Sequence, residues 1–332
     1  MVIQACPVEL LDKLFEFTAY ADPKNAPASL RSLMLTCSYF HPIARRHFIR
    51  IVCLPNEEKM NAFAYYLLQV LEGGDYGKGV LPIQHLAVVG GYRWKADNKD
   101  WYCSDAVAKA MRVVPVILSI AAPTLLTLTI FGMKSDHRFL FGSIQVARQN
   151  WEDNFEEPIF PKLHDLIALE QKVLDLLTVD GESGPDKRAC QLSFPSLRRL
   201  FIPSLPDSHQ VALPSALPYL ADLRLDMQSS TIPPPPKKAV DHVRSLIIDA
   251  PAPSSSLHQG DRLSRRQAKC NAQCRTLIEE VGTPERNGVV FSAYGPETSA
   301  YRDPDCILSA WADAVVGGEA CWTTAWVSEW RL

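Results

Sequence analysis

The sequence predicts an α/β protein with a helical N-terminal module over residues 1–54 and a region of strand–helix repeats with a parallel sheet over residues 55–332. Apolar side chains recur at helical spacing in the first fifty residues. A short motif of one proline and two or three apolar residues then returns several times along the chain, with helix-like segments between its copies. The 332 residues suffice to bury a sizeable core.

Three short helices are predicted in the N-terminal module. The first begins at Pro7, which suits a first helical turn, and Glu9 in that turn faces the positive end of the helix dipole. Its apolar stripe consists of Leu10, Leu11, Leu14, Phe15 and Phe17. We expect a break over Pro23–Pro27, a second helix capped by Ser29, a third from Pro42, and a strand from Ile49 to Leu54.

These segments resemble an F-box of the kind common in mushroom-type fungi. Matching residues are Pro7, Glu9, Leu10, Leu14 and Phe15 in the first block, and Leu30, Thr36, Cys37 and Phe40 in the second. Cys6 departs from the usual leucine, and the loop from Thr18 to Pro27 is longer than typical. The resemblance implies that a Skp-type adaptor, and through it a cullin ubiquitin ligase, binds at Pro7, Glu9, Leu10, Leu14, Phe15, Leu33 and Phe40. The alternative is a helical subdomain that packs its stripe on its own core.

The repeated motif places leucines after a proline. It occurs at Pro123, Pro161, Pro195 and Pro218, and weaker copies start near Ile83 and Val243. The leucines that follow each proline alternate as in a strand with one buried face. Strand, helix and strand at such a period are typical of an irregular leucine-rich-repeat solenoid, in which neighbouring parallel strands place these leucines at equivalent inward positions. A compact α/β domain whose strands start at a proline is the alternative.

In a solenoid, the residues between the inward leucines project from the concave sheet. We expect a protein substrate to contact Arg198, Asp222, Arg224 and Arg244 there, because their mixed charge suits a reversible protein contact. Residues from about 250 to 332 are expected to cap the last repeat, with Trp311, Trp322, Trp326 and Trp330 near the end. A binding patch of exposed aromatic residues is the alternative for this segment.

The uncharged stretch from Val113 to Met133 is long enough to span a bilayer. Because Pro115 and Pro123 interrupt it, we interpret it as a buried helix followed by a buried strand.

Composition and motifs favour a non-catalytic adaptor located in the cytoplasm or nucleus. A net charge of -3 argues against a nucleic-acid binder, and the acidic start argues against a signal peptide. The run Gly73–Gly79 lacks the spacing of a phosphate loop, and Cys270 and Cys274 lack a second pair at zinc-site spacing. We therefore expect no cofactor, metal, nucleic-acid or membrane partner. The hypothesis is a substrate-recognition subunit of a cullin-type ligase, and the alternative is a repeat scaffold with a degenerate F-box.

Overall fold

The computed structural model describes residues 6–72, 82–89, 93–94, 101–102, 114–131, 160–168, 194–202, 217–227, 234–251, 268–270, 272–274, 276–277, 289–294 and 304–318. The chain divides into two compact units. Unit 1 comprises residues 1–152 and 307–319, and unit 2 comprises residues 153–306 and 320–332. The helical module of residues 1–54 and the strands that follow it directly lie in the same unit.

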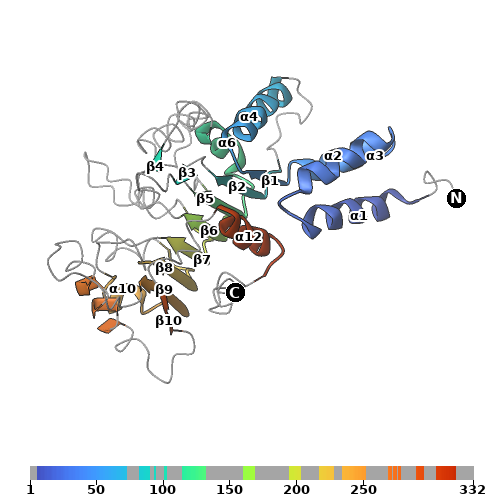
Figure 1. Ribbon diagram of the computed structural model, residues 1–332. Helices are drawn as coiled ribbons and strands as arrows, with labels where there is room; N and C mark the ends of the chain where they lie inside the picture. The colour runs from blue at the N-terminus through green and yellow to red at the C-terminus, as the bar shows by residue number, and fades with distance from the viewer. Residues whose placement is uncertain are drawn as a thin grey trace, which may run out of the picture. The chain divides into compact units, whose positions relative to one another are not determined.

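Three helices form the N-terminal module of unit 1. They are α1 (Val8–Ala21), α2 (Ala26–Thr36) and α3 (Phe40–Phe48), and each contacts the other two (Figure 1). Leu11, Phe15 and Ala19 are buried along one side of α1, since residues four apart share a helix face. The Phe15 ring meets the Phe40 ring edge to face, with 5.2 Å between centroids. The predicted helical module is confirmed.

The boundaries of α2 correct the sequence prediction. The helix begins at Ala26 rather than after Ser29, so the break covers only the residues between Ala21 and Ala26. Pro27 does not end the connection but lies in the first turn of α2. A proline is tolerated there because the first N–H groups of a helix have no partner inside the helix.

Unit 1 also contains parallel strands. They are β1 (Ile51–Leu54), β2 (His85–Val89) and β5 (Thr127–Phe131), with β2 between the other two. Ile51 is aligned with His85, and His85 with Thr127. Helix α4 (Glu57–Glu72) follows β1, and β3 (Arg93–Trp94) pairs with β4 (Trp101–Tyr102) in an antiparallel ribbon. The strand predicted over Ile49–Leu54 is confirmed from Ile51 onward as β1, whereas Ile49 and Arg50 form a turn after α3.

The described part of the uncharged stretch, residues 114–131, contains two elements. Helix α6 (Val114–Ala121) has 8 residues, and β5 follows it. Among the described residues, no helix is long and apolar enough to cross a membrane. The prediction of a buried helix followed by a buried strand is therefore confirmed.

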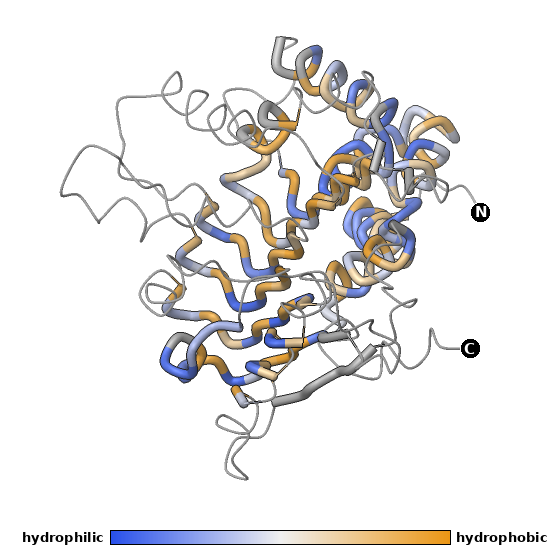
Figure 2. Tube along the Cα trace, turned by 60° about the vertical axis from the view of Figure 1, so that its left-hand side comes forward, coloured by the Kyte–Doolittle hydropathy of each residue, from blue (hydrophilic) through white to orange (hydrophobic). Residues whose placement is uncertain are grey.

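Unit 2 contains strands that pair in parallel, in chain order. They are β6 (Asp165–Ala168), β7 (Arg199–Ile202), β8 (Asp222–Asp226), β9 (Ser245–Pro251) and β10 (Val289–Tyr294). One ladder joins the repeated leucines at equivalent positions: Leu166, Leu200, Leu223 and Leu246. All four are buried, and Figure 2 shows hydrophobic residues in orange along the strands. The predicted parallel alignment of the repeats is confirmed within unit 2, and with it the α/β class.

The sheet is not a solenoid, which corrects the leucine-rich-repeat prediction. A solenoid stacks equivalent repeats, each with a similar return segment. Here the described return segments differ in kind. The 16-residue α4 lies between β1 and β2, the β3–β4 ribbon and the 8-residue α6 lie between β2 and β5, and the four-residue α10 (Lys237–Val240) lies between β8 and β9.

The last described helix, α12 (Pro304–Val315), is followed closely by the glycine pair Gly317 and Gly318. Gly317 has φ 79, a conformation that favours glycine at a helix end. Trp311 is buried on this helix, and from Ile307 onward α12 belongs to unit 1 rather than to the unit of the last strands. The cap expected over residues from about 250 to 332 stays a prediction. Trp322, Trp326 and Trp330 lie outside the described residues.

Candidate functional site

Helix α1 carries a row of large apolar side chains that remain exposed. The relative exposure is 61% for Leu10, 53% for Leu14 and 70% for Phe17. Successive members are four and three residues apart, so they share one side of the helix. We call these three residues the apolar row. On α2, Leu35 is also exposed, at 76%. Large apolar side chains gathered on one helical module mark an interaction surface more often than isolated ones do.

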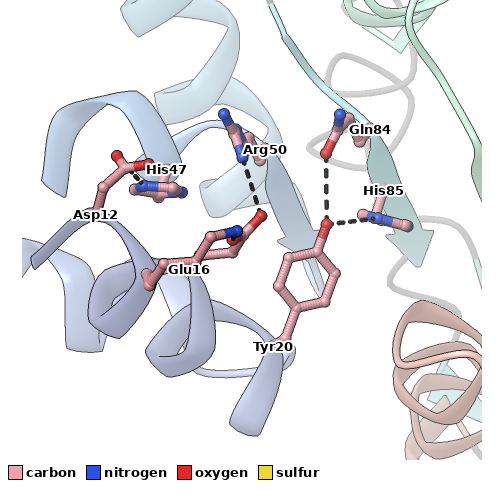
Figure 3. A network of polar contacts seen from close by, with 8 residues as sticks. Asp12, Glu16, Tyr20, His47, Arg50, Gln84 and His85 are labelled. Atoms are coloured by element: carbon pink, nitrogen blue, oxygen red, sulfur yellow. Dashed lines mark hydrogen bonds and ion pairs between the residues drawn. The ribbon is translucent and has the colours of Figure 1, made fainter. Parts of the chain in front are cut away.

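The remaining sides of α1 explain why the apolar row points outward. Leu11, Phe15 and Ala19 form the buried side. Asp12, Glu16 and Tyr20, again four residues apart, form a polar side that contacts the rest of unit 1 (Figure 3). Two sides of the helix are thus occupied by intramolecular contacts, and the third side carries the apolar row.

The polar side of α1 is fixed by contacts to α3, to the turn before β1 and to β2. His47 Nε2 of α3 lies 2.9 Å from Asp12 Oδ1, and Arg50 Nη1, just before β1, lies 3.6 Å from Glu16 Oε1. The Tyr20 hydroxyl lies 3.2 Å from His85 Nε2 on β2 (Figure 3). These contacts set the rotation of α1 about its own axis, and hence the direction in which the apolar row faces.

The buried His85 side chain is uncharged and connects Tyr20 of α1 with Thr127 of β5. Its Nδ1 lies 3.0 Å from the Thr127 hydroxyl of β5, while the Tyr20 hydroxyl donates to Gln84 Oε1 at 3.4 Å. Burial lowers the pKa of His85 to about 4 and raises the pKa of Tyr20. The imidazole is therefore uncharged at neutral pH and links α1 to both strands through hydrogen bonds.

A second electrostatic effect acts at the exposed end of the network. The hydrogen bond from His47 holds the pKa of Asp12 below its usual value, and the hydrogen bond from Lys13 does the same for Glu16. Both carboxylates stay ionised at neutral pH and support the contacts that orient α1.

The adaptor-binding residues predicted from the sequence divide between surface and core. Pro7, Glu9, Leu10 and Leu14 are exposed, and Leu33 is half-buried. Phe15 and Phe40 are buried against each other, so neither side chain is available to a partner. Phe17 and Leu35 were missed. Phe17 belongs to the predicted apolar stripe, and a division of that stripe into helix faces would have separated Leu11 and Phe15 from Leu10, Leu14 and Phe17.

The predicted substrate-contact residues are also divided. Arg198 is exposed, and the Arg244 side chain is 72% exposed while it donates to Asp222 at 2.9 and 3.1 Å. Asp222 itself is buried. Arg224 is fully buried, donates to Asp249 at 2.7 and 3.2 Å, and lies 5.1 Å from the centre of the Phe201 ring. Arg224 is thus part of the core and not of a binding surface.

The described residues contain no group of three or more His, Cys, Asp or Glu side chains that could hold a metal ion. Cys270 and Cys274 are buried one helical turn apart. The run Gly73–Gly79 lies outside the described residues.

Comparison with known proteins finds no family model, no curated protein and no solved structure that matches this chain.

Proposed function

We propose that this protein is the substrate-recognition subunit of a cullin-type ubiquitin ligase. In this proposal, the helical module binds a Skp-type adaptor through the apolar row, and unit 2 binds the protein substrate. The observation that carries the proposal is the apolar row itself, on a helical module whose sequence resembles an F-box.

Apolar surface that becomes buried on binding contributes favourable free energy. Burial of a Leu or Phe side chain is worth about 1.5–3 kcal/mol, and Leu10, Leu14 and Phe17 are each more than half exposed. Folding of the chain does not bury these side chains, and the contacts of the polar side of α1 hold the apolar row in a fixed orientation. A preorganised helix face loses little conformational entropy on binding, so most of the gain is available for affinity.

The proposed mechanism is proximity, and no residue of the chain performs covalent chemistry. A substrate held by unit 2 would be kept close to a charged conjugating enzyme elsewhere in the ligase. Tethering of this kind replaces a bimolecular encounter by an intramolecular one and raises the effective concentration of the reacting groups.

The test is capture of a Skp-type adaptor by the full chain. We expect Leu10→Asp with Leu14→Asp to abolish capture. The double substitution would bury two unpaired charges in an apolar interface, at a cost of several kcal/mol, on the order of the cost of a buried unpaired polar group or more. The fold should persist, since both side chains are exposed.

A matched control uses Tyr65→Asp with Val316→Asp. These two residues are 65% and 53% exposed, close to the values for Leu10 and Leu14, and lie outside the helical module. The control variant should capture adaptor like the wild type. Full capture by the Leu10 and Leu14 variant would exclude adaptor docking through the apolar row. Failure of the wild-type chain to capture adaptor would favour a scaffold without a ligase role.

A further inference from the structure

Four equivalent turns precede the strands β6, β7, β8 and β9 of unit 2. In each, the fourth residue donates its backbone N–H to the carbonyl of the first, at 3.0 to 3.4 Å. The first and fourth residues are buried and apolar. The turns are 160–163, 194–197, 217–220 and 240–243. We call the side of unit 2 formed by these turns and by the residue after each of them the turn edge.

Backbone hydrogen bonds place the residues of the turn edge in a row. The carbonyl of His164 accepts from the N–H of Arg198, that of Arg198 accepts from Ala221, and that of Ala221 accepts from Arg244, at 2.8 to 2.9 Å. The Ser196 hydroxyl also donates to the Pro161 carbonyl at 2.7 Å, which ties two neighbouring turns together. The row is therefore a fixed feature of the sheet.

The exposed charge on the turn edge is mainly positive. Lys162, Arg198 and Arg244 are exposed, and α10, which leads into the fourth turn, adds the exposed Lys237 and Lys238. Asp241 is the one exposed acidic residue among the described residues of these turns and α10. The edge thus carries an excess of exposed cations, although the whole chain has a net charge of -3.

The first residues of β6 and β8, Asp165 and Asp222, form ion pairs with arginines. The Arg199 guanidinium donates to both carboxylate oxygens of Asp165 at 2.5 Å, and Arg244 donates to both oxygens of Asp222. Both carboxylate side chains are nearly covered, with exposures of 7% and 12%. Within the part of the chain that is described, neither Lys162 nor Arg198 has an ion-pair partner. Their charges are available to a ligand.

A large aromatic side chain lies among these cations. Tyr219 occupies the third position of its turn, as Lys162 does in its own turn, and is 67% exposed. Tyrosine and arginine, with tryptophan, are enriched among the residues that contribute most to binding at protein interfaces.

We infer that the turn edge binds an acidic segment of a partner protein in extended conformation. Neighbouring strands lie about 4.8 Å apart, so the turns that hold Lys162 and Arg198 are about 4.8 Å apart along the row, a distance that an extended peptide covers in about two residues. Carboxylates of the segment would pair with Arg198 and Lys162, and an apolar side chain would cover Tyr219. This inference rests on the proposed function only in naming the segment as part of a ligase substrate.

The spacing and number of the groups favour a peptide over a nucleic acid. Nucleic-acid sites neutralise many phosphates along a continuous basic surface. Here the free cations are few, an exposed aspartate accompanies them, and Arg244 is shared with Asp222. Such a mixed surface is suited to a short acidic peptide.

The test measures binding of the full chain to a fluorescein-labelled peptide of alternating Glu and Ser with one central Leu, which can cover Tyr219. The same peptide carrying Gln for Glu is the neutral probe. We expect Lys162→Glu with Arg198→Glu to lower the affinity for the acidic peptide at least about tenfold, since the loss of one charge-assisted hydrogen bond lowers affinity by about that factor. The milder pair Lys162→Gln with Arg198→Gln should lose less. Tyr219→Ala should weaken binding several-fold without a change in its salt dependence.

The matched control, Arg31→Glu with Lys59→Glu, changes the net charge by the same amount at exposed positions of unit 1. It should bind the peptide as the wild type does. An equal loss in this control, equal affinity for the neutral probe, or tighter binding of a single-stranded oligonucleotide that depends on the same two residues would each overturn the inference.

Adaptor capture by the same variants separates this inference from the proposed function. Lys162→Glu with Arg198→Glu should capture adaptor normally, which would support two independent surfaces. If the wild type binds the acidic peptide but captures no adaptor, the turn edge stands and the ligase proposal fails. If it captures adaptor and ignores the peptide, the ligase proposal stands and the turn edge is wrong.

Discussion

Two phenylalanines on α1, two residues apart, should have opposite roles. Phe15 is fully buried against Phe40, whereas Phe17 is 70% exposed in the apolar row. The same substitution at each position therefore separates folding from docking. Phe15→Ala should lower the free energy of unfolding by about 3–5 kcal/mol, because it removes a buried ring and leaves a cavity.

Phe17→Ala should leave stability within about 0.5 kcal/mol of the wild type, since an exposed side chain contributes little to the core. Its effect on adaptor binding follows from its exposure. Complete burial of a Phe side chain is worth about 1.5–3 kcal/mol, and 70% of the Phe17 side chain is still exposed to water, so docking can gain about 1–2 kcal/mol from it. The dissociation constant should rise about 5- to 30-fold.

Urea unfolding and calorimetric titration with a Skp-type adaptor measure the two quantities on the same samples. Titrations are made where circular dichroism shows both variants folded. Wild-type affinity for Phe17→Ala, together with lost affinity for a folded Phe15→Ala, would refute the assignment of the two helix faces. Loss of stability in Phe17→Ala would refute the burial argument.

Two further predictions concern buried polar groups. Burial holds the pKa of His85 at about 4, below its ordinary 6.5, so the unfolded chain binds the extra proton first. The contribution of neutral His85 to the free energy of unfolding should therefore be fully present above about pH 6.5. The free energy of unfolding should fall by up to about 3 kcal/mol as the pH drops towards 4. Urea unfolding should show that this dependence on pH is absent in His85→Gln, and an equal dependence in the variant and the wild type would contradict the prediction. Arg224→Met should destabilise the protein by about 3–5 kcal/mol because it breaks a buried ion pair, and adding Asp249→Leu should restore most of the loss. A double-mutant cycle with no coupling between the two residues would show that the pair is not linked energetically.

Local periodicity determined which segments of this chain become helices and strands. The apolar stripe after Pro7 predicted α1, and the leucines after Pro161, Pro195 and Pro218 predicted the aligned ladder of Leu166, Leu200 and Leu223. Both predictions succeeded because side-chain direction within one helix or strand follows from its own repeat of 3.6 or 2 residues.

Which face of each helix or strand is buried was decided only by the tertiary structure. The stripe on α1 contains Phe15 and Phe17 alike, and only the packing of α3 on α1 places one in the core and leaves the other exposed. In unit 2 the positions between the leucines were expected on an open concave surface. Arg224 is instead buried with its partner Asp249. Parallel strands are commonly covered on both faces, and the alternation of a sequence cannot show what covers the second face. The exposed cations Lys162, Arg198 and Arg244 lie in or directly after the turns that precede the strands. Only the pairing of the strands brings these turns into a row.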